Sequence, residues 1–131
     1  MQNKEIPRFA RQIAETYGGS EGSMLLNIAE SAGVHVIKNS RVQVLLPDEY
    51  AKCLYRPDTG RWTIVFDELR DFETKNFAIA HELGHIFLNH NEEYVSFQAY
   101  IKELERKRGL RVERQADLFA KHLLLSQERR A

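Results

Sequence analysis

The N-terminal quarter of the chain alternates apolar and polar positions with helical spacing. Residues 6–17 predict a short helix with Pro7 in its first turn, where proline's missing N–H costs nothing. A glycine pair then stops the pattern. Residues 20–33 predict a second helix, with Ser23 as its N-cap and Gly33 as its end.

Short β-branched runs follow. Residues 34–38 and 42–46 are rich in valine, isoleucine and leucine, and each predicts a strand. Residues 53–55 and 62–66 predict the two strands of a hairpin, because residues 57–60, Pro-Asp-Thr-Gly, have the composition of a tight turn.

From about residue 71 to the end the pattern is helical. It predicts a central helix to about 89, a second helix over 92–108, a break at Gly109 and a last helix over 112–125. We therefore expect an α+β fold in which a small antiparallel or mixed sheet is followed by a helical half.

Composition narrows the class of protein. The 131 residues carry 19 basic and 19 acidic side chains, so no net charge attracts the chain to nucleic acid or to a membrane. The N-terminus has no apolar signal segment, and Cys53 is the only cysteine, which suits a reducing compartment. We expect a single domain over residues 1–131, in the cytoplasm, with no membrane partner.

A candidate metal site lies in the central helix, where residues 81–85 read H-E-L-G-H. His81 and His85 are four residues apart, so on a helix their imidazoles share one face and can bind zinc together. Glu82 is rotated by about 100° from His81, which suits a catalytic base acting on a metal-activated water better than a ligand. Gly84 would leave space for a substrate.

A catalytic zinc needs a third protein ligand. His90 is one candidate, but the metzincin motif that uses such a histidine would require glycine and histidine where this chain has Leu88 and Asn91. We interpret His90 as a residue just past the helix end.

Glu113 is the stronger candidate for the third ligand. It forms an i, i+4 pair with Asp117, and Ala116 and Ala120 on the same face are small enough for close packing against the central helix. Asp117 would then accept the free ring N–H of one histidine and fix its tautomer.

These paired motifs, AIAHELGHIFLNH and ERQADLFAKHLLL, resemble those of the ImmA/IrrE family of small bacterial and phage metallopeptidases over roughly residues 60–125. The resemblance implies a zincin-like fold of the gluzincin type and one Zn²⁺ per chain. Its ligands would be His81, His85 and Glu113. Glu82 would be the catalytic base, and Asp117 would be a hydrogen-bond partner of a histidine ligand. It also implies a substrate, a cytoplasmic helix-turn-helix repressor whose cleavage relieves repression.

Other features leave alternatives open. The basic stretch 102–114 reads as a solvated helix face, so we expect no direct nucleic-acid binding. A donor for the transition-state oxyanion could come from any of four residues, Tyr94, Tyr100, His90 or Arg70. Two other functions stay possible, a non-hydrolytic module that binds a repressor and a toxin–antitoxin component.

Overall fold

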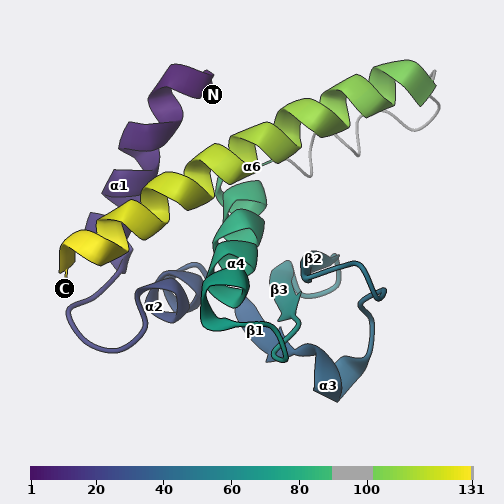
Figure 1. Ribbon diagram of the computed structural model, residues 1–131, viewed down its shortest axis with the longest axis horizontal. Coiled ribbons are helices and arrows are strands. Elements are labelled where there is room, and N and C mark those ends of the chain that lie inside the picture. Colours follow the sequence, from purple (N-terminus) through teal and green to yellow (C-terminus); the bar gives the residue numbers. More distant parts are fainter. Residues whose placement is uncertain (90–101, 131) are drawn as a thin grey trace.

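The computed structural model describes residues 1–89 and 102–130 (Figure 1). A 3₁₀ turn, η1 (Asn3–Glu5), leads into α1 (Ile6–Tyr17), and α2 (Met24–Ser31) follows. The Ser23 hydroxyl accepts a hydrogen bond of 3.3 Å from the backbone N–H of Leu26, which caps α2. Both predicted N-terminal helices are present, the second one shorter than expected.

A mixed three-stranded sheet comes next. It consists of β1 (His35–Lys38), β2 (Ala51–Arg56) and β3 (Arg61–Phe66) in the order β1-β3-β2. β2 and β3 form the predicted antiparallel hairpin, and β1 pairs with β3 in parallel. The hairpin and the strand at 34–38 are therefore confirmed.

The strand predicted at residues 42–46 is wrong. A one-turn helix, α3 (Asn39–Val42), ends where the strand was expected to begin, Gln43 takes a left-handed conformation with φ of 54°, and residues 43–46 form no strand. The Asn39 side-chain oxygen accepts from the backbone N–H groups of Val44 and Leu45 at 3.0 and 3.1 Å. Because these two N–H groups already have acceptors within the segment, they do not require a neighbouring strand as hydrogen-bond partner.

The helical half contains α4 (Phe72–Phe87) and α6 (Lys102–Arg130). The predicted break at Gly109 is wrong, because α6 continues through it. A mid-helix glycine costs about 1 kcal/mol, and α6 offsets such a cost by packing on α1 and α4 and burying Val112, Phe119 and Leu123. Residues 92–101 of the predicted second helix lie outside the described residues.

The elements are arranged around α4. The sheet packs on α4 through β2 and β3, and α6 crosses α4 and runs beside α1 (Figure 1). Phe119 anchors the helical side, with its ring centroid 6.0 Å from that of Phe9 and 6.1 Å from that of Phe87. The expected α+β class with a mixed sheet is confirmed. None of the helices in the described ranges combines the length and apolarity needed to cross a membrane.

Candidate metal centre

α4 carries the two histidines on a face that does not belong to the core. The helix begins at Asp71, whose carboxylate accepts from the backbone N–H of Thr74 at 2.8 Å. One side of α4 buries Ile79 and Leu83. His81 and His85 follow each other by one turn, and their ring centroids lie 4.7 Å apart.

Gly84 decides how closely α6 approaches these histidines. A Cβ atom on Gly84 would lie only 3.2 Å from the Cα and carbonyl oxygen of Ala116 and 3.2 Å from the Phe119 ring. The expectation that Gly84 leaves space for a substrate is therefore wrong, because that space is filled by α6. The missing side chain instead lets the two helices meet closely enough for a short acidic side chain of α6 to reach the imidazoles.

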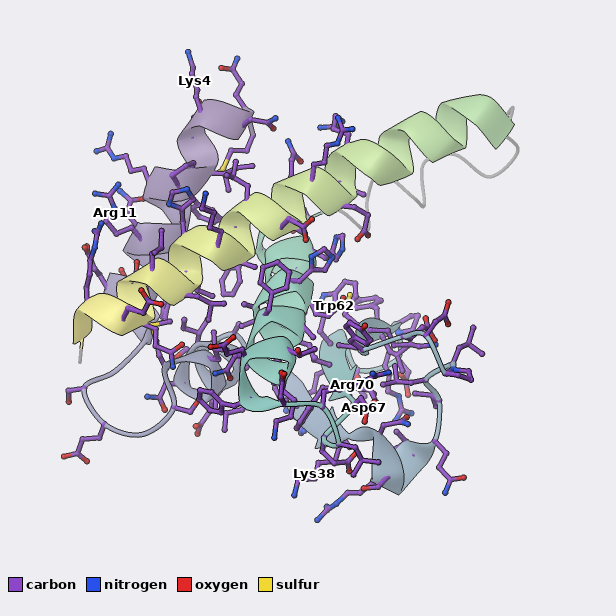
Figure 2. All side chains as sticks on the ribbon, in the orientation of Figure 1. Lys4, Arg11, Lys38, Trp62, Asp67 and Arg70 are labelled. Atoms are coloured by element: carbon purple, nitrogen blue, oxygen red, sulfur yellow. The ribbon has the colours of Figure 1, made fainter. Side chains whose placement is uncertain are left out.

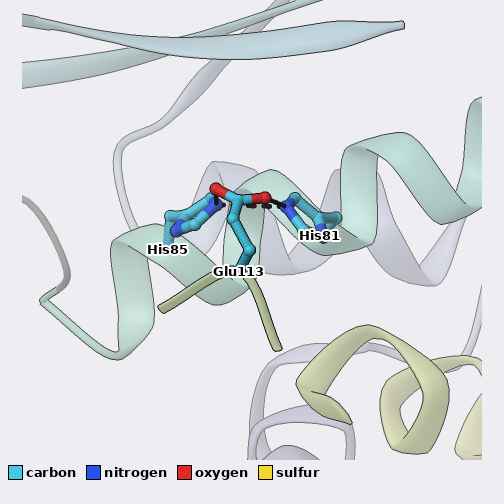
Figure 3. A group of neighbouring side chains, drawn as sticks. All are labelled: His81, His85 and Glu113. Atoms are coloured by element: carbon cyan, nitrogen blue, oxygen red, sulfur yellow. Dashed lines mark hydrogen bonds and ion pairs between the residues drawn. The ribbon is translucent and has the colours of Figure 1, made fainter. Parts of the chain in front are cut away.

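Glu113 is the side chain that bridges the two helices (Figure 3). One of its carboxylate oxygens lies 2.8 Å from Nε2 of His81, and the other lies 3.0 Å from Nε2 of His85. The two Nε2 atoms are themselves 3.1 Å apart. Three potential ligand atoms, two nitrogens and a carboxylate oxygen, thus converge on one small volume.

Asp117, one turn after Glu113, orients one of these imidazoles. Its Oδ1 lies 2.7 Å from Nδ1 of His81, so it accepts the proton that this nitrogen carries. With one proton on Nδ1, Nε2 donates its own proton to Glu113 while His81 is charged, and it has a lone pair for a metal ion once that proton has left. This is the arrangement by which a carboxylate prepares a histidine to bind a metal ion.

The converging atoms favour a cation among them. Hydrogen bonds from His81 and His85 hold the pKa of the Glu113 carboxyl far below its usual range. Burial alone would lower the pKa of His81, but the hydrogen bond to Glu113 and the charges of Glu113, Glu82 and Asp117 outweigh it and raise that pKa. Positive charge, whether a proton or a metal ion, is stabilised at this point.

The donor set fits zinc. Two imidazole nitrogens and one carboxylate oxygen are ligands that zinc accepts, and they leave a fourth position open. Ligand atoms at about 2.0–2.1 Å from a tetrahedral zinc lie about 3.3 Å from one another. The two Nε2 atoms lie 3.1 Å apart, and each lies 2.8 or 3.0 Å from a different oxygen of Glu113, so these separations are a few tenths of an ångström shorter. Small side-chain movements would therefore admit the ion.

Glu82 lines the same cleft as His81 and Glu113, and its side chain is half-buried. Cys53 of β2 lies close enough for the negative charge of the Glu82 carboxylate to act on its thiol. Burial raises the pKa of the Cys53 thiol, and the charge of Glu82 raises it further. Cys53 therefore stays protonated at neutral pH, which suits a donor and not a nucleophile. No sequence signal pointed to this contact, because it depends on how the sheet lies on α4.

Of the four candidate oxyanion donors, Arg70 lies among the described residues, and its side chain is engaged away from the metal group. Arg70 lies beside Asp67 (Figure 2), to which its Nε donates at 2.9 Å, and its guanidinium stacks over the Tyr50 ring at 4.4 Å. His90, Tyr94 and Tyr100 lie outside the described residues. The role of all four stays a prediction.

A cleft of about 1080 Å³ runs from the metal group along α4. Its floor is the α4 face with Phe77 and His81, one wall is the second half of α6, and the other is the segment around Tyr50 that leads into β2. A volume at the upper end of the range of about 300–1,000 Å³ for small-molecule sites has room for several side chains of an extended peptide.

Comparison with known proteins agrees with this architecture. Residues 29–129 match the family model described as the IrrE N-terminal-like domain, a peptidase family. A solved structure of a Mycobacterium tuberculosis transcriptional regulator matches 93% of this chain with a TM-score of 0.58 and 22% identity. This chain spans 36% of that protein's length, and the likeness concerns the fold. No curated protein matches the sequence at a significant level.

Proposed function

Because the chain belongs to the IrrE N-terminal-like family of peptidases, we propose that it is a zinc-dependent endopeptidase that cleaves a cytoplasmic helix-turn-helix repressor and relieves repression. The observation that carries the proposal is the convergence of His81, His85 and Glu113 beside Glu82 at one end of a cleft large enough for a peptide. A single metallopeptidase domain over residues 1–131 stays our prediction.

Each polar side chain of the group has a distinct part in this proposal. His81 and His85 hold the metal through Nε2, and Glu113 holds it through a carboxylate oxygen. Asp117 keeps the proton of His81 on Nδ1, which leaves Nε2 free to bind. When bound, zinc supplies Lewis acidity, which polarises a carbonyl oxygen and makes a water molecule more acidic.

Glu82 then moves the proton. Its carboxylate takes a proton from the attacking water and delivers it to the amine that leaves the cleaved peptide bond. Removing the carboxylate of Glu82 should therefore prevent this proton transfer and leave the metal ligands in place.

The repressor as substrate rests on the resemblance of the paired motifs to the ImmA/IrrE family. The first test combines zinc content and cleavage in three purified proteins, the wild type, Glu82→Gln and Glu113→Gln. We expect about one zinc per chain in the wild type and in Glu82→Gln and a clear loss in Glu113→Gln. Cleavage of candidate repressors should occur with the wild type alone, and Glu82→Gln should fall by at least about 10²-fold.

Two outcomes would overturn parts of the proposal. Wild-type cleavage by Glu82→Gln would remove Glu82 as the base. Repression relief by Glu82→Gln in cells, with no cut repressor, would favour the non-hydrolytic binding module instead.

A further inference from the structure

The cleft beside the metal group has a one-sided charge. Among the described residues that line it, none is lysine or arginine and six are acidic: Asp48, Glu73, Glu82, Glu113, Asp117 and Glu128. The whole chain carries 19 acidic and 19 basic side chains, so the imbalance is a local property of this surface and does not follow from composition. A cleft lined by one sign of charge concentrates ligands of the opposite sign.

Three of these six carboxylates have no proposed role at the metal group. Asp48, Glu73 and Glu128 are exposed, and among the described residues no ion pair holds any of them. They come from the segment before β2, the first turn of α4 and the end of α6. The helix dipole favours an acidic residue at Glu73, while what the three share is that their side chains line the same cleft.

The cations nearest the cleft leave this charge largely uncompensated. Arg70 covers the Tyr50 ring, but its guanidinium is engaged by Asp67 at 2.9 Å. Lys121 lines a neighbouring hollow together with Asp117 and Glu128. No lysine or arginine stands among the described residues of the cleft lining itself, so Asp48, Glu73 and Glu128 are not offset within it.

Aromatic rings separate the carboxylates. Tyr50, Phe72 and Phe77 line the cleft and are 48%, 70% and 39% exposed. Exposed aromatic faces bind apolar side chains and also the flat guanidinium of arginine. The surface therefore offers alternating apolar and negative positions along α4.

We propose that this cleft selects an extended peptide segment in which a lysine or arginine stands next to apolar side chains. The basic side chain lies among Asp48, Glu73 and Glu128, and its apolar neighbours contact Phe72, Phe77 and Leu124. This inference rests on the proposed function, because it describes the substrate preference of a peptidase. The preference in binding can nevertheless be measured without cleavage.

A binding measurement with zinc-loaded Glu82→Gln tests the preference without turnover. The probes are short labelled peptides of alternating leucine and alanine that differ only in one central residue, arginine, glutamine or glutamate. We expect fluorescence anisotropy to give the lowest Kd for arginine, about fivefold below glutamine at about 0.1 M salt, with glutamate weakest. At about 1 M salt the ratio should fall toward one, because the Debye length is then about 3 Å. Equal affinities, or tightest binding of the glutamate peptide, would overturn the inference.

Matched variants locate the charge. In the same Glu82→Gln background, the triple change Asp48→Asn, Glu73→Gln and Glu128→Gln should bring the ratio between the arginine and glutamine peptides to within about twofold. A control triple, Glu15→Gln, Glu21→Gln and Glu30→Gln, changes net charge equally at exposed positions outside the cleft and should keep the ratio. Circular dichroism checks that both variants are folded. An equal loss in both triples would show general electrostatics and overturn the assignment to this cleft.

Cleavage of a mixed peptide library by the wild type separates this inference from the proposed function. Cuts flanked by basic and apolar residues support both. Cuts with no charge preference keep the peptidase and overturn the selectivity. No cuts, with the arginine peptide still bound best, overturn the peptidase and keep the selectivity.

Discussion

The two ends of the cleft use carboxylates in opposite ways. At the metal end, Glu113 and Asp117 each contact a histidine at 3.0 Å or less. At the open end, Asp48, Glu73 and Glu128 are exposed and no ion pair in the described part of the chain holds them.

This difference teaches what each charge can do. The carboxylates of Glu113 and Asp117 are also exposed, but each is held by short hydrogen bonds to a histidine, so it fixes geometry and its loss leaves the neighbouring polar atoms unsatisfied. An exposed carboxylate that no ion pair holds contributes a screened field, typically worth less than about 1 kcal/mol. Substitutions at the metal end should therefore have large effects on metal binding, and those at the open end should have almost none.

The largest expected effect is the loss of zinc-dependent stability in Glu113→Gln. A ligand that binds the folded state at about 100 times its Kd stabilises it by about 2.7 kcal/mol, which raises Tm by several degrees in a chain of this size. Zinc should raise the Tm of the wild type and of Glu128→Gln, a change on the same helix at the open end, but not that of Glu113→Gln. Differential scanning fluorimetry with and without a chelator measures this. Equal zinc-dependent increases in Tm in all three proteins would show that the two ends of the cleft do not differ in metal binding.

A smaller effect is expected for Asp117→Asn. The amide can still accept a hydrogen bond from Nδ1 of His81 but carries no charge, and changes of this kind cost about 10–100-fold in metal affinity. Competition with a chromophoric chelator gives the zinc Kd. Asp48→Asn is the matched change at the open end and should stay within about twofold of the wild type. A weaker Kd for Asp48→Asn than for Asp117→Asn would contradict the comparison.

Gly84→Ala sharpens the comparison through packing and not through charge. The new methyl group would lie 3.2 Å from the Ala116 backbone, and overpacking costs about 1–3 kcal/mol. Better helix propensity returns about 1 kcal/mol at most, so the variant should be destabilised by up to about 2 kcal/mol in urea unfolding. Zinc affinity should fall with it, because Glu113 is displaced from the histidines. Unchanged stability and affinity would mean that α6 is not positioned by this contact.

The smallest effect concerns the metal-free protein and its pH dependence. Burial lowers the pKa of His81, but Glu113, Glu82 and Asp117 outweigh it and raise that pKa above its ordinary value. The stabilisation is complete below the unfolded pKa of about 6.5 and is lost as pH rises through the folded pKa. With chelator present, wild-type stability should fall as pH rises above about 6.5, and Glu113→Gln should show a flatter profile. Parallel profiles would argue against the coupling.

The sequence by itself determined the local features of this protein. The start of α4 at Asp71, the one-turn spacing of His81 and His85 and the hairpin of β2 and β3 all follow from periodicity and turn composition. The same reasoning paired Glu113 with Asp117 on a face of small residues. Their expected place beside the histidines agrees with the structure, while their roles as zinc ligand and orienting group stay predictions.

Only the tertiary structure decided which segments meet. Periodicity could not show that Gly84 faces Ala116, because the register between two helices depends on how their side chains interdigitate. It wrongly predicted a strand at residues 42–46, where the Asn39 side chain satisfies two backbone N–H groups locally, and a helix break at Gly109, through which α6 continues. It also could not assemble the acidic cleft, whose walls are 48–51, 72–82 and 113–128. Charges scattered along the sequence become a surface only when packing brings their segments together.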